Sequence, residues 1–119
     1  MSTYVDGFVI PIKKSNVRAY KKMAALGCKM WMKHGALAYF ECEGDDLNIA
    51  WGWTFPKMCQ LKAGETVIFA FIVYKSKAHR NQVNKKVLAD PAMNMEGQKM
   101  PFDMKRFAMG GFKTLVQSK

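Results

Sequence analysis

The chain lacks the long apolar run that a membrane-spanning helix needs. It has 119 residues, and nowhere do about eighteen apolar residues follow one another. Its first residues, Met1 to Asp6, contain no basic stretch followed by an apolar core, so we expect no signal peptide. Hydrophobic residues make up 50% and charged residues 24%, which excludes a disordered or collagen-like chain. We therefore expect a single globular domain over residues 1–119, located in the cytoplasm.

Histidine and cysteine are scarce, which limits metal and disulfide chemistry. The two histidines, His34 and His79, each lack a second ligand three or four residues away, so no metal site is expected. Three cysteines, an odd number without a Cys-x-x-Cys pair, predict no disulfide framework and fit a reducing compartment better. Cys28 falls in a helical pattern and Cys42 in a strand pattern, so we predict both to be small core residues.

The sequence also lacks the short motifs that identify common hydrolases and nucleotide-binding proteins. It contains no Gly-x-Ser-x-Gly nucleophile motif, no phosphate-binding Walker loop and no Gly-x-Gly-x-x-Gly dinucleotide motif. Hydrolase and nucleotide-cofactor functions therefore find no support, and we predict no cofactor. The sequence by itself names no reaction.

Basic residues outnumber acidic ones by a wide margin. Nineteen Lys and Arg against nine Asp and Glu give a formal net charge of +10. The basic residues are spread along the chain, without the long like-charge block of a basic tail. We interpret them as a solvated surface, and the alternative is a surface for nucleic acid or an acidic ligand.

Hydrophobic periodicity predicts six regular elements in the order β-α-β-β-α-β. They are a strand over 4–12, a helix over 16–34, strands over 37–43 and 66–74, a helix over 77–89, and a strand over 106–116. An irregular segment over 48–60 carries Trp51, Trp53 and Phe55, which must be covered by something. Gly110-Gly111 suggests a bulge or bend in the last strand.

Capping residues frame both predicted helices. Ser15 is a candidate N-cap of the first helix and Gly35 a candidate C-terminal cap. Ser76 is the candidate N-cap of the second helix, which Asp90-Pro91 ends. The first helix carries an inward stripe at spacings of three and four, formed by Val17, Tyr20, Ala24, Gly27, Trp31 and His34.

This order of elements predicts an α+β fold of the ferredoxin-like type, in which two helices cover one face of a four-stranded antiparallel sheet. The strand over 66–74 is apolar without alternation, which is typical of a strand buried on both faces. Two helices cover only one face, so we expect a second copy of the chain to cover the other. The predicted partner is therefore the protein itself, in a homodimer formed through the sheet face.

Several motifs, matching in order along nearly the whole chain, resemble the YbaA-like family of uncharacterised bacterial proteins (domain of unknown function 1428). They are Tyr4-Val5-Asp6-Gly7-Phe8-Val9, Trp31 with His34-Gly35-Ala36-Leu37, Glu41 with Gly44-Asp45-Asp46, Val73-Tyr74, Ser76, Ala78-His79-Arg80, Asp90-Pro91, Met100-Pro101-Phe102-Asp103, Lys105-Arg106 and Gly110-Gly111-Phe112. The resemblance implies a dimeric α/β-barrel fold, but no reaction. The chain departs from the family over residues 47–53. If this loop shapes a ligand site, the specificity of that site should differ from that of the family.

Asp6 is unusual because it lies in the middle of a predicted central strand. A buried carboxylate must be paired or neutral. We expect a structural ion pair with Arg106, which begins the neighbouring last strand. The alternative is a catalytic or ligand-binding carboxylate.

Trp31 and His34 lie three residues apart on the inward side of the first helix. One interpretation is core packing. The other is a small-molecule pocket between the first helix and the sheet, with Trp31 as a wall, His34 as a general base and Glu41 orienting that base. Cofactor-free catalysis there is part of this hypothesis, with Asp6, His34 and Glu41 as candidate catalytic residues.

Further candidate ligand-binding residues come from the second half of the chain. His79 and Arg80 open the second helix, where an arginine favours anions. Phe102 and Asp103, with Arg106, are predicted to form a turn that closes the pocket. Four methionines in the same region suit an adaptable cover over a ligand or simply fill gaps, namely Met93, Met95, Met100 and Met104.

The alternative function is a single-stranded RNA-binding module of the RNA-recognition type. Such modules share the β-α-β-β-α-β order and expose aromatic residues on the third strand. Phe69 to Tyr74 fits the end of their strand-three signature, while Val67-Ile68 replaces its opening basic-Gly pair. If Phe69 and Phe71 stack on bases, the sheet face cannot also be sealed in a dimer.

Overall fold

The computed structural model describes residues 2–93 and 97–119. Met95, one of the four methionines singled out above, lies outside the described residues. The elements run in the order β1 (Tyr4–Lys13), η1 (Lys14–Asn16), α1 (Val17–Lys33), β2 (Ala38–Glu43), α2 (Phe55–Met58), β3 (Glu65–Tyr74), α3 (Lys77–Ala89), η2 (Pro91–Met93) and β4 (Ala108–Lys113).

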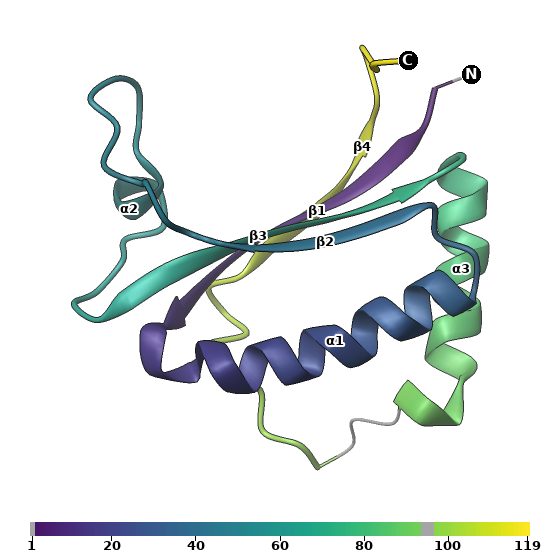
Figure 1. Cartoon of the computed structure of the whole chain (residues 1–119), viewed down its shortest axis with the longest axis horizontal. Coiled ribbons are helices and arrows are strands. Elements are labelled where there is room, and N and C mark those ends of the chain that lie inside the picture. The colour runs from purple at the N-terminus through teal and green to yellow at the C-terminus, as the bar shows by residue number, and fades with distance from the viewer. Residues whose placement is uncertain (1, 94–96) are drawn as a thin grey trace.

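The four strands form one sheet in the order β2-β3-β1-β4, and all neighbouring strands are antiparallel. Both long helices, α1 and α3, lie on the same side of this sheet (Figure 1). The predicted α+β, ferredoxin-like fold is confirmed. No described helix is long and apolar enough to cross a membrane.

The predicted helix starting near residue 16 begins one residue later and without the expected cap. Ser15 lies inside the 3-10 turn η1, and Asn16 is the N-cap of α1 but makes no capping side-chain bond. The end is as predicted, because Gly35 follows the helix at a φ of 114°, a backbone conformation that a glycine adopts without strain. The inward stripe is confirmed, since Tyr20, Ala24 and Gly27 are buried.

The second helix matches its prediction closely. Ser76 is its N-cap, and the side-chain hydroxyl of Ser76 accepts a hydrogen bond from the backbone N–H of His79 at 3.1 Å. Val83 and Val87 form its buried stripe and pack into a cluster with Tyr74 and Ile72 of β3. This cap and this stripe fix the rotation of α3 and therefore which polar residues of α3 face the sheet.

Alternation along the strands separates the sheet into two chemically different faces. The face under the helices, here called the helix face, carries the core, with Ile10 and Ile12 from β1 and Ile68 and Ala70 from β3 packed against Tyr20 of α1. The opposite face is called the open face. From β1 Val5 to Pro11 and β3 Val67 to Val73 it carries only apolar residues and glycine.

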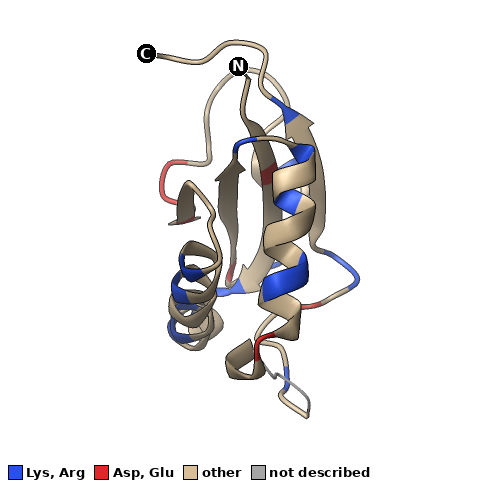
Figure 2. Cartoon of the chain, turned by 90° about the vertical axis from the view of Figure 1, so that its right-hand side faces the viewer, with Lys and Arg blue, Asp and Glu red and all other residues tan. Residues whose placement is uncertain are grey.

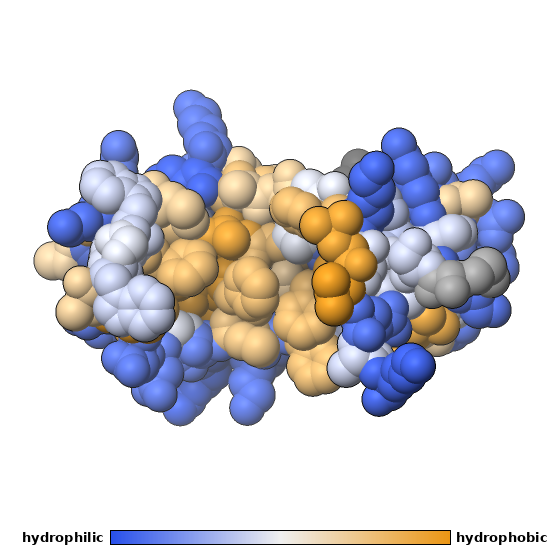
Figure 3. Space-filling model, turned by 90° about the horizontal axis from the view of Figure 1, so that it is seen from above, coloured by the Kyte–Doolittle hydropathy of each residue, from blue (hydrophilic) through white to orange (hydrophobic). Residues whose placement is uncertain are grey.

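The edge strands continue this uncharged open face with Ala38, Phe40, Cys42, Ala108, Gly110 and Phe112. Seen from above, its centre is hydrophobic (Figure 3). Phe69 is 46% exposed, so β3 is not buried on both faces within one chain. The prediction that Cys42 is a core residue is wrong for the single chain, because Cys42 is exposed, whereas Cys28 is half-buried.

Two irregular segments rise beside the open face. One follows β2 and includes the short helix α2, and the other is the C-terminal tail after β4 (Figure 1). The first segment leaves Trp51 84% and Trp53 72% exposed, and the tail leaves Leu115 90% exposed. The tryptophans, which the sequence requires to be covered, therefore lack a cover within the described chain.

The last strand is shorter than predicted and has no bulge. It spans Ala108–Lys113, and its register with β1 runs without interruption through Gly110 and Gly111. A Cβ at Gly111 would collide with the ring of Tyr4. The glycine therefore makes room for a side chain of the neighbouring strand rather than bending its own.

Nine of the nineteen lysines and arginines fall within α1 and α3, and Figure 2 shows them along both helices. Arg18, Lys22, Lys29 and Lys33 are exposed on α1, as the helical periodicity predicts. About half of the basic residues are therefore on the two helices, whereas the open face carries none from Val5 to Pro11 or from Val67 to Val73.

Candidate functional site

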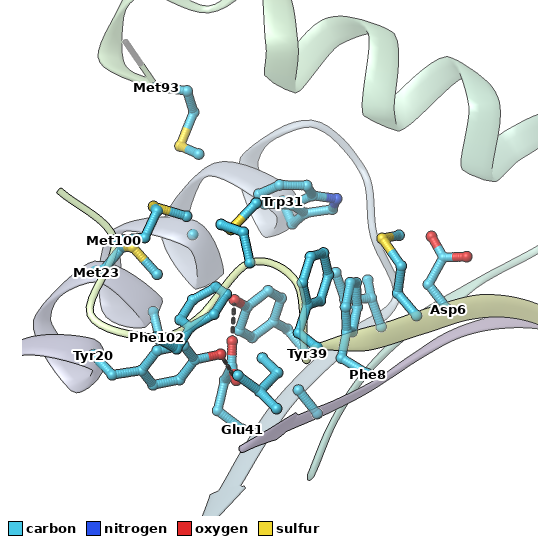
Figure 4. Close-up of a pocket in the computed structure, with 18 of the residues that line it drawn as sticks. Asp6, Phe8, Tyr20, Met23, Trp31, Tyr39, Glu41, Met93, Met100 and Phe102 are labelled. Carbon is cyan, nitrogen blue, oxygen red and sulfur yellow. Dashed lines mark hydrogen bonds between the residues drawn. The ribbon is translucent and has the colours of Figure 1, made fainter. Parts of the chain in front are cut away.

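A cavity of about 350 Å³ lies between α1 and the helix face of the sheet. The strands β1, β2 and β3 form its floor, α1 one wall, and the segment that leads into β4 another. Figure 4 shows its side chains, most of them apolar or aromatic. Polar groups enter at two places, one around Glu41 and the other around Asp6.

Glu41 of β2 is held by two phenols. The hydroxyl of Tyr20 on α1 donates to one carboxylate oxygen at 2.6 Å, and the hydroxyl of Tyr39 donates to the other at 2.7 Å (Figure 4). Burial, and then the hydrogen bond to Glu41, raises the pKa of both phenols well above the ordinary value. Both tyrosines therefore keep their protons and act as donors to Glu41.

Asp6 of β1 is only 2% exposed and forms an ion pair with Arg80 of α3 at 2.7 Å. The guanidinium of Arg80 also lies 5.1 Å from the centre of the Tyr4 ring, a distance at which a cation and an aromatic ring attract. Burial raises the pKa of Asp6 above its ordinary value, while Arg80 opposes that rise.

Asn84 of α3, one helical turn after Arg80, holds two aromatic side chains. Its side-chain oxygen accepts hydrogen bonds from the indole N–H of Trp31 at 3.0 Å and from the hydroxyl of Tyr74 at 3.3 Å. Asp6, Trp31 and Asn84 all line the cavity. The bond from Trp31 fixes the indole as a wall rather than leaving it free to turn.

Methionine and phenylalanine side chains close the remaining sides of the cavity. Phe102 packs edge-on against the ring of Tyr20, with ring centres 5.8 Å apart. Met93, Met100 and Met104 line the cavity, a position that fits both an adaptable cover and gap filling, and Met23 and Met109 join them. Unbranched thioether side chains adjust to ligands of different shape at little cost.

The structure brings together four of the nine predicted site residues. Asp6, Trp31, Glu41 and Phe102 line the cavity. The other five, which lie outside its lining, are His34, His79, Arg80, Asp103 and Arg106. Arg80 still serves the site indirectly, because it neutralises Asp6.

His34 does not act on the cavity, and Glu41 does not orient it. The ring Nε2 of His34 lies 2.8 Å from a carboxylate oxygen of Asp90, which Lys33 also contacts at 3.1 Å. His34 is the residue after α1, and the chain has by then passed the cavity. His79 accepts a hydrogen bond from the backbone N–H of Lys75 at 2.9 Å, which serves the helix start rather than a ligand.

The predicted Asp6–Arg106 ion pair is wrong. The register places Gly111, five residues after Arg106, opposite Asp6. Arg106 instead binds Glu65 at the start of β3, at 2.7 and 2.9 Å. The predicted turn is present, since the backbone N–H of Arg106 donates to the carbonyl of Asp103 at 3.1 Å.

Three residues of the site, Tyr20, Tyr39 and Asn84, had no predicted functional role. Strand alternation places Tyr39 on the same face as Glu41, and the helical stripe turns Tyr20 inward, so both signals were available. Asn84 lies one helical turn after Arg80 and beside the apolar Val83, a position that carries no sequence mark of its own.

Comparison with known proteins bears on the whole chain. Residues 3–104 match the family described as "Protein of unknown function (DUF1428)". The chain belongs to the DUF1428 family. The uncharacterised protein YbaA of Escherichia coli strain K12, similar to this DUF1428 chain, is 36% identical over 113 residues, which cover 95% of the chain and 97% of YbaA. YbaA of Shigella flexneri matches to the same extent.

A solved structure supports the fold of this DUF1428 member. The crystal structure of a dimeric ferredoxin-like protein from an uncultured marine organism superimposes with a TM-score of 0.58 and 10% sequence identity. The alignment covers 100% of this chain and 99% of the marine one. At that identity the likeness establishes the fold alone.

Proposed function

We propose that the chain binds a small, largely apolar molecule in the cavity beneath α1, and that it does so as a homodimer. The observation that carries the first part is the cavity itself. It is lined by aromatic and thioether side chains, and few polar groups converge on it, a pattern typical of ligand sites.

The size of the cavity limits the ligand. An apolar cavity of about 150 Å³ is enough to hold benzene. A volume of 350 Å³ therefore suits a molecule of roughly two rings or an equivalent aliphatic body. The polar contacts at Glu41 and at Asn84 would fix the orientation of such a molecule.

The open face supports the second part of the proposal. A contiguous apolar surface larger than a few hundred Å² is rare on monomers and is normally an interface. The exposed Phe40, Phe69 and Phe112 lie on this face, which has no charged side chain from Val5 to Pro11 or from Val67 to Val73. A second copy brings a face of the same chemistry, and the dimeric state of the marine ferredoxin-like protein is consistent with this arrangement.

The RNA-binding alternative uses the same face. Phe69 and Phe71 lie on it as that hypothesis requires, and Phe71 stacks on Phe40 with ring centres 4.9 Å apart. Binding of a nucleic-acid backbone needs lysine or arginine beside the aromatic residues. The open face lacks them from Val5 to Pro11 and from Val67 to Val73, so we favour the second copy as its occupant.

A pair of variants on neighbouring residues of α1 tests ligand binding. Ala24 is buried and lines the cavity, whereas Ala25 is exposed. In a screen of one- and two-ring compounds, monitored by protein NMR chemical shifts, the parent chain and Ala25→Phe should share the same binders. Ala24→Phe fills the cavity and should lose them. Binders that ignore Ala24→Phe, or a screen without binders, would reject the proposal.

A further inference from the structure

Glu41 stands apart from the other buried acids of the molecule. The ion pairs among the described residues join Asp90 with Lys33 and His34, Asp6 with Arg80, and Glu65 with Arg106. None includes Glu41. Its carboxylate faces the cavity with two phenols as its protein partners and no cation beside it.

The phenol protons around Glu41 are already donated to its carboxylate and are not free for a ligand. Each phenol has one proton, and Tyr20 and Tyr39 both donate theirs to Glu41. What remains toward the cavity is a set of acceptor lone pairs on the carboxylate and on the two phenol oxygens. At the other end of the cavity, the indole N–H of Trp31 is likewise used on Asn84. A ligand group that meets Glu41 must therefore supply donors.

The lining of the cavity also lacks positive charge. No Lys, Arg or His is among the described residues that line it, in a chain whose formal net charge is +10. Tyr20 and Tyr39 contact the carboxylate through their hydroxyls, and Phe102 packs against Tyr20. The faces of aromatic rings attract cations. The net charge of the whole molecule opposes the approach of a cation, but salt screens that repulsion beyond about 8 Å.

From these observations we infer that the ligand carries a cationic head, a primary ammonium group on an apolar body, and that this head binds Glu41 between Tyr20 and Tyr39. An ammonium group offers three donors and no acceptor, which matches an acceptor-only cluster. Anionic ligands have no place there. This inference rests on the proposed function, because it names the chemical class of the molecule that the cavity binds.

The test uses three compounds that share an indole body and differ in the head group, namely tryptamine, tryptophol and indole-3-acetate. Their affinities for the parent chain are measured by isothermal titration calorimetry at neutral pH. We expect tryptamine to bind on the order of tenfold more tightly than tryptophol, the range of a charge-assisted hydrogen bond. Indole-3-acetate should bind most weakly.

Two matched variants locate the effect. Glu41→Gln keeps the shape and removes the charge, so the preference for tryptamine should disappear while tryptophol still binds. Glu43→Gln changes a carboxylate two residues along the same strand, outside the cavity lining, and should keep the preference. Tyr39→Phe, which leaves the charge in place, should retain a preference for tryptamine. If Glu41→Gln does not fold, Glu41→Asp, which withdraws the carboxylate from the cavity, should weaken the preference.

The outcomes separate this inference from the proposed function. If tryptophol binds as tightly as tryptamine, or if the preference survives in Glu41→Gln, the cationic head is rejected and the cavity still binds ligands. If none of the three compounds binds the parent chain, ligand binding by the cavity is itself rejected for molecules of this size. A preference for indole-3-acetate would overturn the cationic head directly.

Discussion

The two faces of one sheet carry different chemistry in this molecule. The helix face holds Asp6 and Glu41, each with named hydrogen-bond partners, around a cavity. The open face, built from the alternate residues of the same strands, carries no charge from Val5 to Pro11 or from Val67 to Val73. Strand alternation thus lets the same strands carry buried carboxylates beside a cavity on one side and an apolar surface on the other.

The faces also differ in how completely their polar groups are satisfied. Among the described residues, no buried side-chain nitrogen or oxygen lacks a hydrogen-bond partner. On the helix face, α1 and α3 supply such partners through Tyr20, Arg80 and Asn84. The open face needs only apolar contact, which the same face of a second chain would provide. Substitutions on the open face should therefore change the oligomeric state, whereas substitutions on the helix face should lower the stability of the folded chain.

The largest effect should come from placing a charge on the open face. In Phe69→Lys, each copy in a dimer loses a buried phenyl ring and gains a buried ammonium group. Losing two such rings alone costs roughly 3–6 kcal/mol per dimer. Light scattering should show the parent chain at twice its 13.5 kDa mass and the variant at 13.5 kDa.

Leu88 gives the matched control, because it is 79% exposed on α3, away from the sheet. Leu88→Lys should remain dimeric. A parent chain of 13.5 kDa whose stability is unaffected by Phe69→Lys would show that the open face is free. In that case RNA affinity that falls steeply with added salt would favour the nucleic-acid alternative.

The second effect, on the helix face, should be a loss of stability without a change of mass. Arg80→Met removes the partner of Asp6 and leaves a carboxylate that is 2% exposed. Breaking a buried pair in this way costs about 3–5 kcal/mol, measured by urea unfolding at neutral pH. Because the pKa of Asp6 is already raised by burial, the loss should shrink as the pH is lowered and the carboxyl takes up a proton.

The double variant Asp6→Asn with Arg80→Met sharpens this result. It removes both charges, so the unfolding free energy should recover part of the loss seen in Arg80→Met alone. Equal losses in the single and double variants would mean that the pair is not coupled. The Arg106→Met variant breaks the other arginine pair, whose acid, Glu65, is not on the helix face, and should leave the response to Asp6→Asn unchanged.

The sequence predicts the fold well because local signals agree with one another. Ser76 before an apolar stripe, Gly35 after another, and six periodic segments in the β-α-β-β-α-β order each restrict the topology, and the structure follows them. The shared motifs add the family, which the match over residues 3–104 establishes. Element ends were less predictable, as Ser15 and the last strand show, since several residues there satisfy the same local rule.

The partners of charged residues were the weakest predictions. Asp6 was expected to meet Arg106 because their strands are neighbours, but strand order does not give register, and the register differs by five positions. Arg80 reaches Asp6 through the docking of α3 on the sheet, a tertiary contact between residues 74 positions apart. Periodicity places a side chain on a face, whereas only packing selects its partner.

The third effect compares two acids through their response to pH. The hydrogen bonds from Arg106 and from the backbone of Lys62 lower the pKa of Glu65 to about 2, from an ordinary 4.5. Its stabilising contribution is complete above pH 4.5 and is lost as the pH falls toward 2. The difference in unfolding free energy between the parent chain and Glu65→Gln should therefore shrink over that range, measured by urea unfolding.

Asp6 should show the opposite slope. Its pKa lies above the ordinary 3.8, so the folded chain holds that proton more tightly than the unfolded chain. The contribution of Asp6 to stability therefore declines as the pH rises above 3.8. In Asp6→Asn this decline should vanish. If the stability contributions of Glu65 and Asp6 changed in the same direction with pH, burial would not be the main influence on the pKa of Asp6.

The smallest effect tests how closely the helices fit the helix face. A Cβ on Gly27 of α1 would lie 2.9 Å from the hydroxyl oxygen of Tyr39, so in Gly27→Ala that hydroxyl must move. Alanine favours the helix by about 1 kcal/mol, and a disturbed hydrogen bond to Glu41 costs about the same. We expect nearly unchanged stability in urea unfolding, together with weaker tryptamine binding.

Ala25→Gly, on the exposed side of the same helix, is the control, because it measures the helix preference alone. If Gly27→Ala is stabilised by as much as Ala25→Gly is destabilised, Tyr39 moves freely, and the acceptor cluster around Glu41 is looser than its 2.7 Å hydrogen bond indicates.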